Sequence, residues 1–360
     1  MVLGLLPAMS WAQEFKVTLL GTGSPPAEID RFGPAALVVA GSEQLLFDAG
    51  RGAAQRLRQL AISMSDLDAV FLTHLHADHT VGLADLWLAA SLDARTAPLT
   101  MYGPQGTREM VAHLGRAFEA DQRIAAVAAG TVSHQIAQGE VYRQNGVTVT
   151  AFHVDHAAGS TPAFGYRIDY AGRSIVLSGD TRPSDNLVQF AKGTDVLIHE
   201  VIAARPAALA ASARAKQTAS IHTSPEDAGR IFDRVKPKLA VYTHVSLLGG
   251  PAGREILARE LLPRTRSTYA GAVEIGEDLM TIVVGEKVEV RRSARTPAAL
   301  DDSQPAPPRP GLDIGRDQAM QKGRRLIRLL LLAADQRDSR QDITLTNDAG
   351  RDPMIHLNAV

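Results

Sequence analysis

Three histidines and one aspartate lie within six positions of each other, directly after an apolar segment that ends at Leu72. These residues are His74, His76, Asp78 and His79. His74 and His76 are two positions apart, so an extended backbone places both side chains on one side. Asp78 and His79 fall where the chain turns into an expected helix, and there they can address a second point about 3–4 Å from the first. Because several unpaired imidazoles buried together would be costly, the cluster indicates a metal site.

Further candidate ligands follow or end strand-like segments elsewhere in the chain. They are His156, His199, His222 and His244, together with Asp180 in the sequence LSGDT, where a glycine permits close approach. The chain contains 11 histidines and no cysteine. Disulfides, thiolate nucleophiles, iron–sulfur clusters and sulfur-ligated zinc are therefore excluded. Imidazole and carboxylate ligands suit zinc, with manganese or iron as alternatives.

The composition describes a chain that can bury a sizeable core. Its 360 residues are 45% hydrophobic and 21% charged, which excludes wholesale disorder and predicts one large domain or two small ones. The 38 lysines and arginines nearly balance the 39 aspartates and glutamates, for a net charge of −1. No overall excess of positive charge favours nucleic acid or an anionic membrane as a partner.

Three regions are expected along the chain. Residues 1–12 combine an apolar run with a small-x-small pattern and resemble a secretory signal peptide, with a buried strand as the alternative. This run is too short to span a membrane, and no other segment is long enough. Residues 13–292 read as one compact α/β domain, and residues 293–360 as a Pro-rich linker followed by a poorly ordered or helical tail. If residues 1–12 are a signal peptide, the protein is expected to be periplasmic or secreted. Otherwise it is expected in the cytoplasm.

Apolar and β-branched segments predict the strands that must position the candidate ligands. The expected strands are Val17–Leu20, Ala36–Val39, Gln44–Phe47, Ala69–Leu72, Leu99–Tyr102, Val147–Phe152, Tyr166–Tyr170, Ser174–Leu177, Val196–Ile198, Leu239–Tyr242 and Leu279–Val284. The expected helices are Gly52–Ile62, Val81–Leu92, Gln105–Phe118 and Ser224–Val235, the last with a serine N-cap. Strand-rich halves that are each followed by helices favour two sheets packed face to face.

The order of several short motifs resembles the metallo-β-lactamase superfamily. These motifs are HLHADH, FGYRI, SGDTRPS, IHE, HTS and THVS, and the segments VTLLGTGSPP and LLFDAGRGAAQRL fit as well. Within the superfamily, the chain is most similar to the branch of ribonuclease Z and the arylsulfatase-like hydrolases. The resemblance covers roughly Glu14 to Val284. It implies an α/β fold, the four-layer αββα sandwich, with a dinuclear metal site at one edge.

The resemblance also implies which residues bind the two metal ions, most simply two Zn²⁺, with Mn²⁺ or Fe²⁺ possible. It assigns His74, His76 and His156 to the first ion, Asp78, His79 and His244 to the second, and Asp180 to both as a bridge. Many β-lactamases of this fold use a cysteine ligand and lack the bridging aspartate. A β-lactam substrate is therefore disfavoured.

The chemistry implied is hydrolysis, because two cations lower the pKa of a shared water and supply hydroxide at neutral pH. Asp78 can orient this nucleophile or accept its proton. His222 resembles the family's proton donor to the leaving group, and Glu200 resembles the residue that orients it, although both could be structural. Asp48 is expected to support the ligand loop or simply to form a turn. His153 is expected to point away from His156 and to play no part.

Three substrate classes remain open, and the first is preferred. A phosphodiesterase-like or arylsulfatase-like hydrolase would cleave a small anionic ester, namely a sulfate, phosphate or phosphodiester. The alternative is an endonuclease of the ribonuclease Z type that processes tRNA 3′ ends, and the second alternative is a lactone or carboxylic ester hydrolase. Nucleic acid is judged unlikely, because segment 168–175 closes without an inserted tRNA arm, the net charge is near zero and a leader is expected. Arg31 is a candidate contact for a substrate anion, and a homodimer is possible.

Overall fold

The computed structural model describes residues 14–93, 95–156 and 162–293, and two short segments, 343–345 and 355–357. The chain divides into two units, residues 1–295 and 296–360. In the second unit, the described segments are strands β16 (Ile343–Leu345) and β17 (Ile355–Leu357), which pair antiparallel. The predicted leader at residues 1–12 and the predicted helical tail lie outside the described residues. None of the described helices is long and apolar enough to cross a membrane.

The first unit contains two β-sheets. One has eight strands in the order β15-β14-β1-β2-β3-β4-β5-β6, and the other has seven in the order β13-β12-β11-β10-β9-β8-β7. The first sheet comprises β1 (Phe15–Gly21), β2 (Ala35–Ala40), β3 (Glu43–Phe47), β4 (Ala69–Phe71), β5 (Thr100–Gly103), β6 (Val132–Gln135), β14 (Thr281–Val284) and β15 (Val288–Arg291). The second comprises β7 (Gly139–Gln144), β8 (Val147–Val154), β9 (Ala163–Tyr170), β10 (Arg173–Leu177), β11 (Val196–Ala204), β12 (Leu239–Leu248) and β13 (Val273–Ile275).

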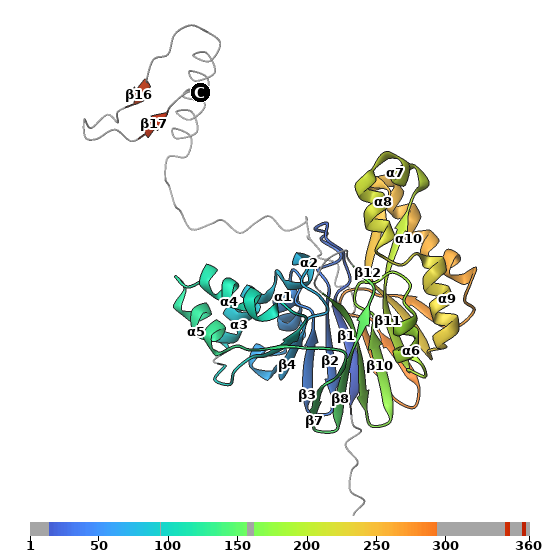
Figure 1. The fold of residues 1–360 in the computed structure, drawn as a ribbon, viewed down its shortest axis with the longest axis horizontal. Helices are drawn as coiled ribbons and strands as arrows, with labels where there is room; N and C mark the ends of the chain where they lie inside the picture. Colours follow the sequence, from blue (N-terminus) through green and yellow to red (C-terminus); the bar gives the residue numbers. More distant parts are fainter. Residues whose placement is uncertain (1–13, 94, 157–161, 294–342, 346–354, 358–360) are drawn as a thin grey trace, which may run out of the picture. The chain divides into compact units, whose positions relative to one another are not determined.

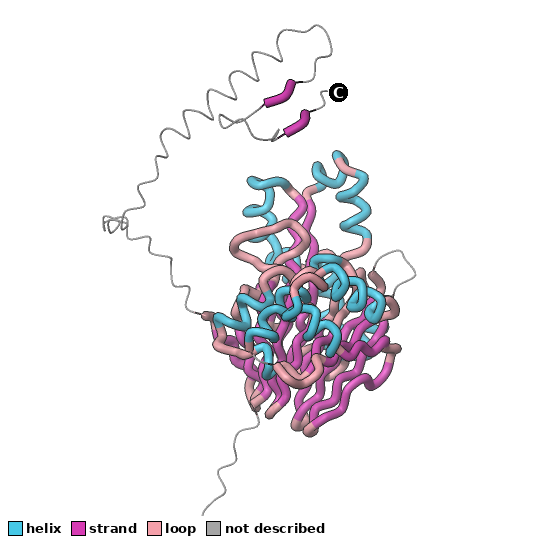
Figure 2. Tube along the Cα trace, turned by 90° about the vertical axis from the view of Figure 1, so that its left-hand side faces the viewer, coloured by secondary structure: helices cyan, strands magenta, loops and turns pink. Residues whose placement is uncertain are grey.

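Helices cover the outer face of each sheet (Figure 1). Those that follow the strands of the first sheet are α1 (Ala53–Gln59), α2 (Ala77–Thr80), α3 (Leu83–Leu92), α4 (Thr107–Ala117) and α5 (Gln122–Gly130), with a 3₁₀ turn at Met64–Asp66. Those that follow the strands of the second are α6 (Asp185–Ala191), α7 (Pro206–Ala211), α8 (Ala213–Ser220), α9 (Pro225–Val235) and α10 (Gly250–Arg266). Figure 2, turned by 90°, shows helices of the first group in front of the strands. The four-layer αββα sandwich expected from the sequence is confirmed.

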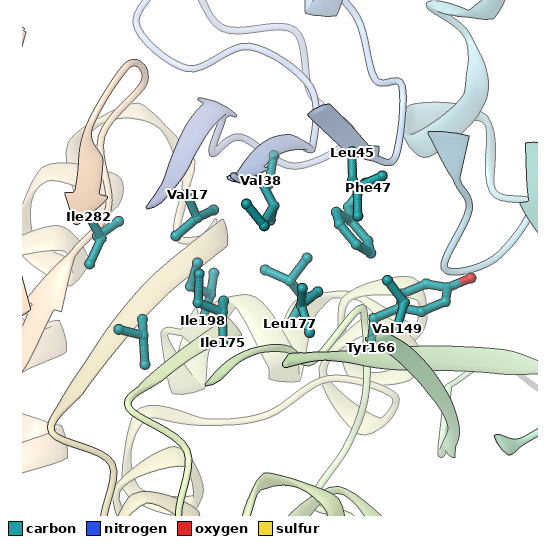
Figure 3. Close-up of a cluster of buried hydrophobic side chains, with 14 of the residues drawn as sticks. Val17, Val38, Leu45, Phe47, Val149, Tyr166, Ile175, Leu177, Ile198 and Ile282 are labelled. Carbon is teal, nitrogen blue, oxygen red and sulfur yellow. The ribbon is translucent and has the colours of Figure 1, made fainter. Parts of the chain in front are cut away.

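The main hydrophobic core lies between the two sheets (Figure 3). Val38 and Phe47 from the first sheet face Leu177 and Ile198 from the second, and all four are almost fully buried. Phe47 stacks on Phe71 with ring centroids 4.9 Å apart. Alternation along each strand sends the other set of side chains outward, under the helices, where two further apolar clusters form. The central strands of each sheet are therefore held from both faces.

Hydrogen bonds join the two sheets close to the histidine cluster. The hydroxyl group of Tyr166, on β9, donates to the backbone carbonyl of Leu72 at 2.7 Å. The backbone N–H of Phe164 donates to the carbonyl of Thr73 at 2.9 Å. On the other side, the N–H of Val245 donates to the carbonyl of Thr22 at 2.9 Å. The loops that carry the candidate ligands are thus fixed across the sandwich, and not only within their own sheets.

The sequence pattern located the buried elements better than the exposed ones. Every strand expected from an apolar run is present, with ends that differ by a few residues. The missed elements are β6, β7, β13, β15, α2, α5, α6, α7, α8, α10 and the 3₁₀ turn in the first unit, and β16 and β17 in the second. Strand β6 is mostly exposed and polar, and so gives no apolar run. Helix α10 contains Pro263, which normally argues against a helix interior.

We expect Tyr166→Phe to destabilise the domain, because it leaves the buried carbonyl of Leu72 without its side-chain partner. The expected loss in the free energy of unfolding is about 1–3 kcal/mol, measured by chemical denaturation. Tyr102→Phe is the matched control, since no hydrogen bond of the Tyr102 hydroxyl group is found among the described residues. Equal stability of the two variants would contradict the proposed link between the sheets.

Candidate dinuclear metal site

The candidate ligands meet at one edge of the sandwich, where strands of both sheets end. His74, His76, Asp78 and His79 follow β4 of the first sheet. The second sheet supplies the others from separate strand ends: His156 after β8, Asp180 after β10 and His244 within β12. Parallel strands bring their carboxyl ends to a common edge, which explains how residues so distant in sequence converge.

The first group consists of three imidazoles with nitrogen atoms that face one point. His76 Nδ1 lies 2.9 Å from His74 Nε2 and 3.2 Å from His156 Nε2. His74 and His156 are buried, whereas His76 is exposed at the rim. These are the three residues that the family resemblance assigned to the first ion, and their ligand atoms form one of the groups able to hold a metal.

The second group combines one carboxylate with two imidazoles. Asp78 Oδ2 lies 3.4 Å from His79 Nε2 and 3.2 Å from His244 Nε2. His79 and His244 are each 2% exposed. The structure thus also brings together the three residues that the family resemblance assigned to the second ion.

Asp180 lies between the two groups. Its Oδ2 atom is 3.9 Å from His74 Nε2 and 3.7 Å from His156 Nε2 on one side. On the other side, it is 3.4 Å from His79 Nε2 and 3.2 Å from His244 Nε2. This is the position of a bridging ligand.

These separations fit a pair of metal ions. For metal–nitrogen bonds of 2.0–2.1 Å, two ligands at the tetrahedral angle lie roughly 3.3 Å apart, which is close to the measured separations. His79 Nε2 and Asp180 Oδ1 are also buried without a hydrogen-bond partner among the described residues. Buried polar atoms normally have partners, so these atoms require a ligand. The donor atoms and their geometry are therefore those of a dinuclear metal centre.

A local irregularity in β12 positions His244. The pairing of β11 with β12 shifts register between Glu200 and Val201, because Glu200 pairs with Thr243 and Val201 pairs with Val245. His244 is the extra residue of this β-bulge, and its φ is +44°, a left-handed value that is unusual for a histidine. Bulges re-aim side chains, and this one lets a buried strand present an imidazole at the sheet edge.

Three ligand imidazoles have a hydrogen-bond partner at the ring nitrogen that faces away from the metal centre, whereas His244 Nδ1 is buried without one among the described residues. Asp48 Oδ2 accepts from His79 Nδ1 at 2.8 Å, and Asp48 also accepts from the hydroxyl group and the N–H of Thr73. Since the Thr73 hydroxyl group donates to Asp48, it accepts from His74 Nδ1 at 3.0 Å. His156 Nδ1 donates to the carbonyl of Ile221 at 3.0 Å. Each bond fixes a tautomer that leaves Nε2 free to bind a metal.

The electrostatics of the site favour cations. Burial would lower the pKa of His79, but the carboxylates of Asp180 and Asp48 outweigh it and hold this pKa well above its usual value. Burial would raise the pKa of Asp180, but His244 and His79 hold it well below its usual value. For His74, burial dominates and lowers the pKa, which favours the neutral imidazole that binds metals. The buried carboxylate is thus ionised and needs positive charge beside it.

His222 and Glu200 form a pair next to the metal ligands. His222 Nδ1 lies 3.2 Å from Glu200 Oε1, and that oxygen also accepts from the N–H of Thr223 at 2.9 Å. Burial alone would lower the pKa of His222, but Glu200 raises it to about 9. The ring of His222 stacks over that of His244 at 5.4 Å. His222 can therefore hold a proton at the edge of the centre.

Other sequence candidates lie outside the site. Arg31 donates to the hydroxyl group of Thr22 at 2.6 Å and to the carbonyl of Gly276 at 2.7 Å, so its guanidinium braces a loop. His153 is exposed and stacks on Phe164, as its place in strand β8 predicted. His199 is fully buried and lies on the Phe232 side of β11, with ring centroids 5.7 Å apart.

Sequence reasoning missed two supports of the site. Thr73, directly before the histidines, joins Asp48 to His74, and a hydroxyl group at a strand end is too common a feature to single out. Asp278 accepts from the N–H groups of Thr22 and Phe32 and from Arg56. Asp278 lies 222 residues from Arg56, and no local pattern could reveal that contact.

Comparison with known proteins agrees with this geometry. Residues 43–245 match a family model described as a beta-lactamase superfamily domain. Proteins named ribonuclease Z are 37% identical over 279 residues in Mycobacterium bovis (strain BCG / Pasteur 1173P2) and 35% identical over 279 residues in Mycobacterium marinum. Each alignment covers 75% of this chain and 98% of the relative.

Solved structures show the same fold. The metallo-beta-lactamase fold protein YhfI from Bacillus subtilis aligns with a TM-score of 0.61 and 20% identity, over 76% of this chain and all of YhfI. The short form of human tRNase Z aligns with a TM-score of 0.55 and 24% identity, over 74% of this chain and 98% of that chain.

The relatives contradict two expectations from the sequence. They carry the name ribonuclease Z, so the preference for a small anionic ester as the substrate was wrong. The judgement that nucleic acid is an unlikely partner was wrong for the same reason. Both expectations relied on the overall net charge, on a predicted leader and on the missing arm, none of which is part of the metal site.

We expect Asp48→Asn to weaken metal binding by about 10- to 100-fold, because the amide no longer provides a full negative charge for His79 Nδ1–H. Competition with a chelating indicator dye measures this affinity. Asp68→Asn is the control, since Asp68 accepts from the backbone of Gln44 and does not contact the ligands. Unchanged affinity in Asp48→Asn would show that Asp48 serves only the loop.

Proposed function

Because the chain belongs to the ribonuclease Z branch of the metallo-β-lactamase superfamily, we propose that it is a metal-dependent endonuclease that processes the 3′ ends of precursor tRNA. The observation that carries the proposal is the convergence of seven ligand residues, in a chain whose alignment with a ribonuclease Z covers 75% of this chain and 98% of that relative. A tRNA substrate implies that the protein works in the cytoplasm. This is the location expected when residues 1–12 are not a leader.

The resident metals are proposed to be two zinc ions. His74, His76 and His156 would hold one, Asp78, His79 and His244 the other, and Asp180 both. Nitrogen and oxygen donors at these separations fit zinc, and manganese or iron would accept the same donors. When bound, the pair polarises a phosphoryl oxygen and makes a water molecule nucleophilic at neutral pH.

The side chains of the protein supply the proton transfers. Asp78 is partly exposed at the open side of the centre, and its carboxylate can orient the attacking water and accept its proton. Attack forms a new P–O bond and breaks the bond to the leaving oxygen. Because Glu200 Oε1 lies 3.2 Å from His222 Nδ1, this carboxylate can orient the imidazole so that His222 gives its Nε2 proton to the leaving oxygen. The Glu200 carboxylate beside it raises the pKa of His222 to about 9, so His222 carries a proton for this step.

The substrate must reach this centre without an arm between β9 and β10. Strand β9 ends at Tyr170 and β10 begins at Arg173, so a two-residue turn joins them. Ala171 and Gly172 both have positive φ, as a tight hairpin turn requires. The sequence expectation that this place holds no inserted arm therefore agrees with the structure, and contacts to RNA must come from elsewhere.

We expect the purified protein to cut a precursor tRNA transcript at one position near the 3′ end of the mature sequence. A chelator should abolish the cleavage and added zinc should restore it, because the nucleophile depends on the metals. Denaturing gel electrophoresis of an end-labelled transcript measures the cut. An unstructured RNA of equal length is the control. Cleavage of both RNAs at many positions, or of neither, would contradict the proposed function.

We expect His222→Ala to lower kcat on precursor tRNA by about 10²- to 10⁴-fold while both metals stay bound, because it removes a proton donor and no ligand. Elemental analysis of the purified variant measures the metal content. Groups of atoms that include His222 could also hold an ion. Loss of one metal equivalent would therefore identify His222 as a ligand instead. The exposed His153, changed to alanine, is the control.

A further inference from the structure

A pair of short helices stands beside the metal centre. Helices α7 and α8 follow β11 and end directly before His222. We call residues 205–220 the α7–α8 hairpin. Figure 1 shows it extending beyond the edge of the sheets, at the end of β11 and β12, well away from α4 and α5. Neither of its helices buries a residue, so the hairpin adds little to the hydrophobic core.

The charge of this segment differs from that of the whole chain. Residues 201–225 contain no aspartate or glutamate, but contain Arg205, Arg214 and Lys216. The hairpin therefore carries a charge of +3 in a chain with a net charge of −1. Arg214 and Lys216 are exposed, and Arg205 is partly exposed. Such a segment has a local positive potential that the chain average conceals.

None of these three side chains forms an ion pair or hydrogen bond with the described part of the protein. Cations elsewhere on the surface are commonly neutralised, as Arg182 is by Asp155 and Arg254 is by Glu28. Unpaired cations close to each other repel and do not stabilise the fold. They remain available to an anionic partner, which gains the Coulomb attraction without breaking an internal pair.

The base of the hairpin is part of the metal centre. The carbonyl of Ile221 accepts from the ligand His156, and the N–H of Ile202 donates to the carbonyl of Thr223 at 2.9 Å, on either side of the hairpin. Beyond the bulge, β11 and β12 stay paired up to Ala204 and Leu248, which carries the hairpin outward on a two-stranded stem. A polyanion with one phosphodiester in the centre can thus extend along the hairpin.

We propose that the α7–α8 hairpin is a docking surface for the phosphate backbone of the RNA substrate. The inference rests on the proposed function, since it places a polynucleotide at the metal centre. Arg205, Arg214 and Lys216 contact phosphates without reading bases, because they belong to a surface of alanines and small polar residues. The short β9–β10 turn cannot contact RNA. The α7–α8 hairpin, which lies between β11 and His222, supplies these contacts instead.

The test compares two triple variants of the full chain with equal changes in charge. One removes the hairpin cations, as R205Q/R214Q/K216Q. The control removes three other exposed, unpaired cations of the described residues, as R108Q/R116Q/K287Q, from α4 and the β14–β15 turn. Fluorescence anisotropy measures the Kd for precursor tRNA from 50 to 200 mM salt, and cleavage assays measure KM and kcat. Metal content is measured in parallel.

We expect the hairpin variant to keep its metals and kcat, and to raise Kd and KM about tenfold at low salt. Its slope of log affinity against log salt should become shallower by about 2 to 3, because three fewer phosphates are neutralised and fewer counterions are released on binding. The control variant should resemble the unaltered protein. Equal losses in both variants, or none in either, would overturn the docking surface.

The outcome separates the inference from the proposed function. A protein that does not cleave precursor tRNA, but binds it through the hairpin, would contradict the endonuclease and support the docking surface. If the protein cleaves precursor tRNA and neither triple variant is impaired, the endonuclease function is supported and the docking surface is contradicted. If the hairpin variant loses affinity for vesicles of phosphatidylglycerol while RNA affinity is unchanged, the surface serves a membrane and the inference is wrong.

Discussion

A buried carboxylate surrounded by imidazoles is the constraint on which the architecture depends. Asp180 is 3% exposed, and nitrogen atoms of four histidines lie within 3.9 Å of its Oδ2 atom. Neutral imidazoles alone cannot compensate an ionised carboxylate that has lost its water, so this arrangement demands cations. Because ligands come from both sheets, the demand can be met only when the sandwich is fully assembled. Folding and metal binding are therefore coupled in this domain.

The donors are held in place by hydrogen bonds that also join the two sheets. Thr73 contacts Asp48 and His74 through its side chain, and its carbonyl accepts from Phe164 on the opposite sheet. On the other side, the bulge at His244 is followed by a bond from Val245 to the first sheet. The loop after β4 and the bulge in β12 are thus each hydrogen-bonded to the opposite sheet. Rigid mounting of this kind keeps ligand atoms within a few tenths of an ångström of their working positions.

The sequence predicted the parts of the site that depend on local order. The spacing of His74 and His76 after an apolar strand was enough to suggest a metal, and the motif order gave the partners His156, Asp180 and His244. What it could not predict depends on distant contacts. Arg31 was a candidate for binding an anion, yet its guanidinium is used by Thr22 and Gly276. The bulge that turns His244 inward exists only because β11 and β12 pair, and single strands carry no sign of it.

The wrong substrate preference has a physical explanation. A metal centre that activates water acts on any phosphodiester it can reach, so its ligands do not distinguish a small ester from an RNA. Surfaces outside the centre determine which substrate binds. The net charge of the chain does not reveal the charge of any one surface, because opposite charges on distant faces cancel in the sum. In this chain, the net charge of −1 includes a stretch of 25 residues around His222 that has three cations and no acidic residue. Since screening confines electrostatic attraction to about 10 Å, each cation acts on the phosphates next to it, and charges on distant faces contribute little.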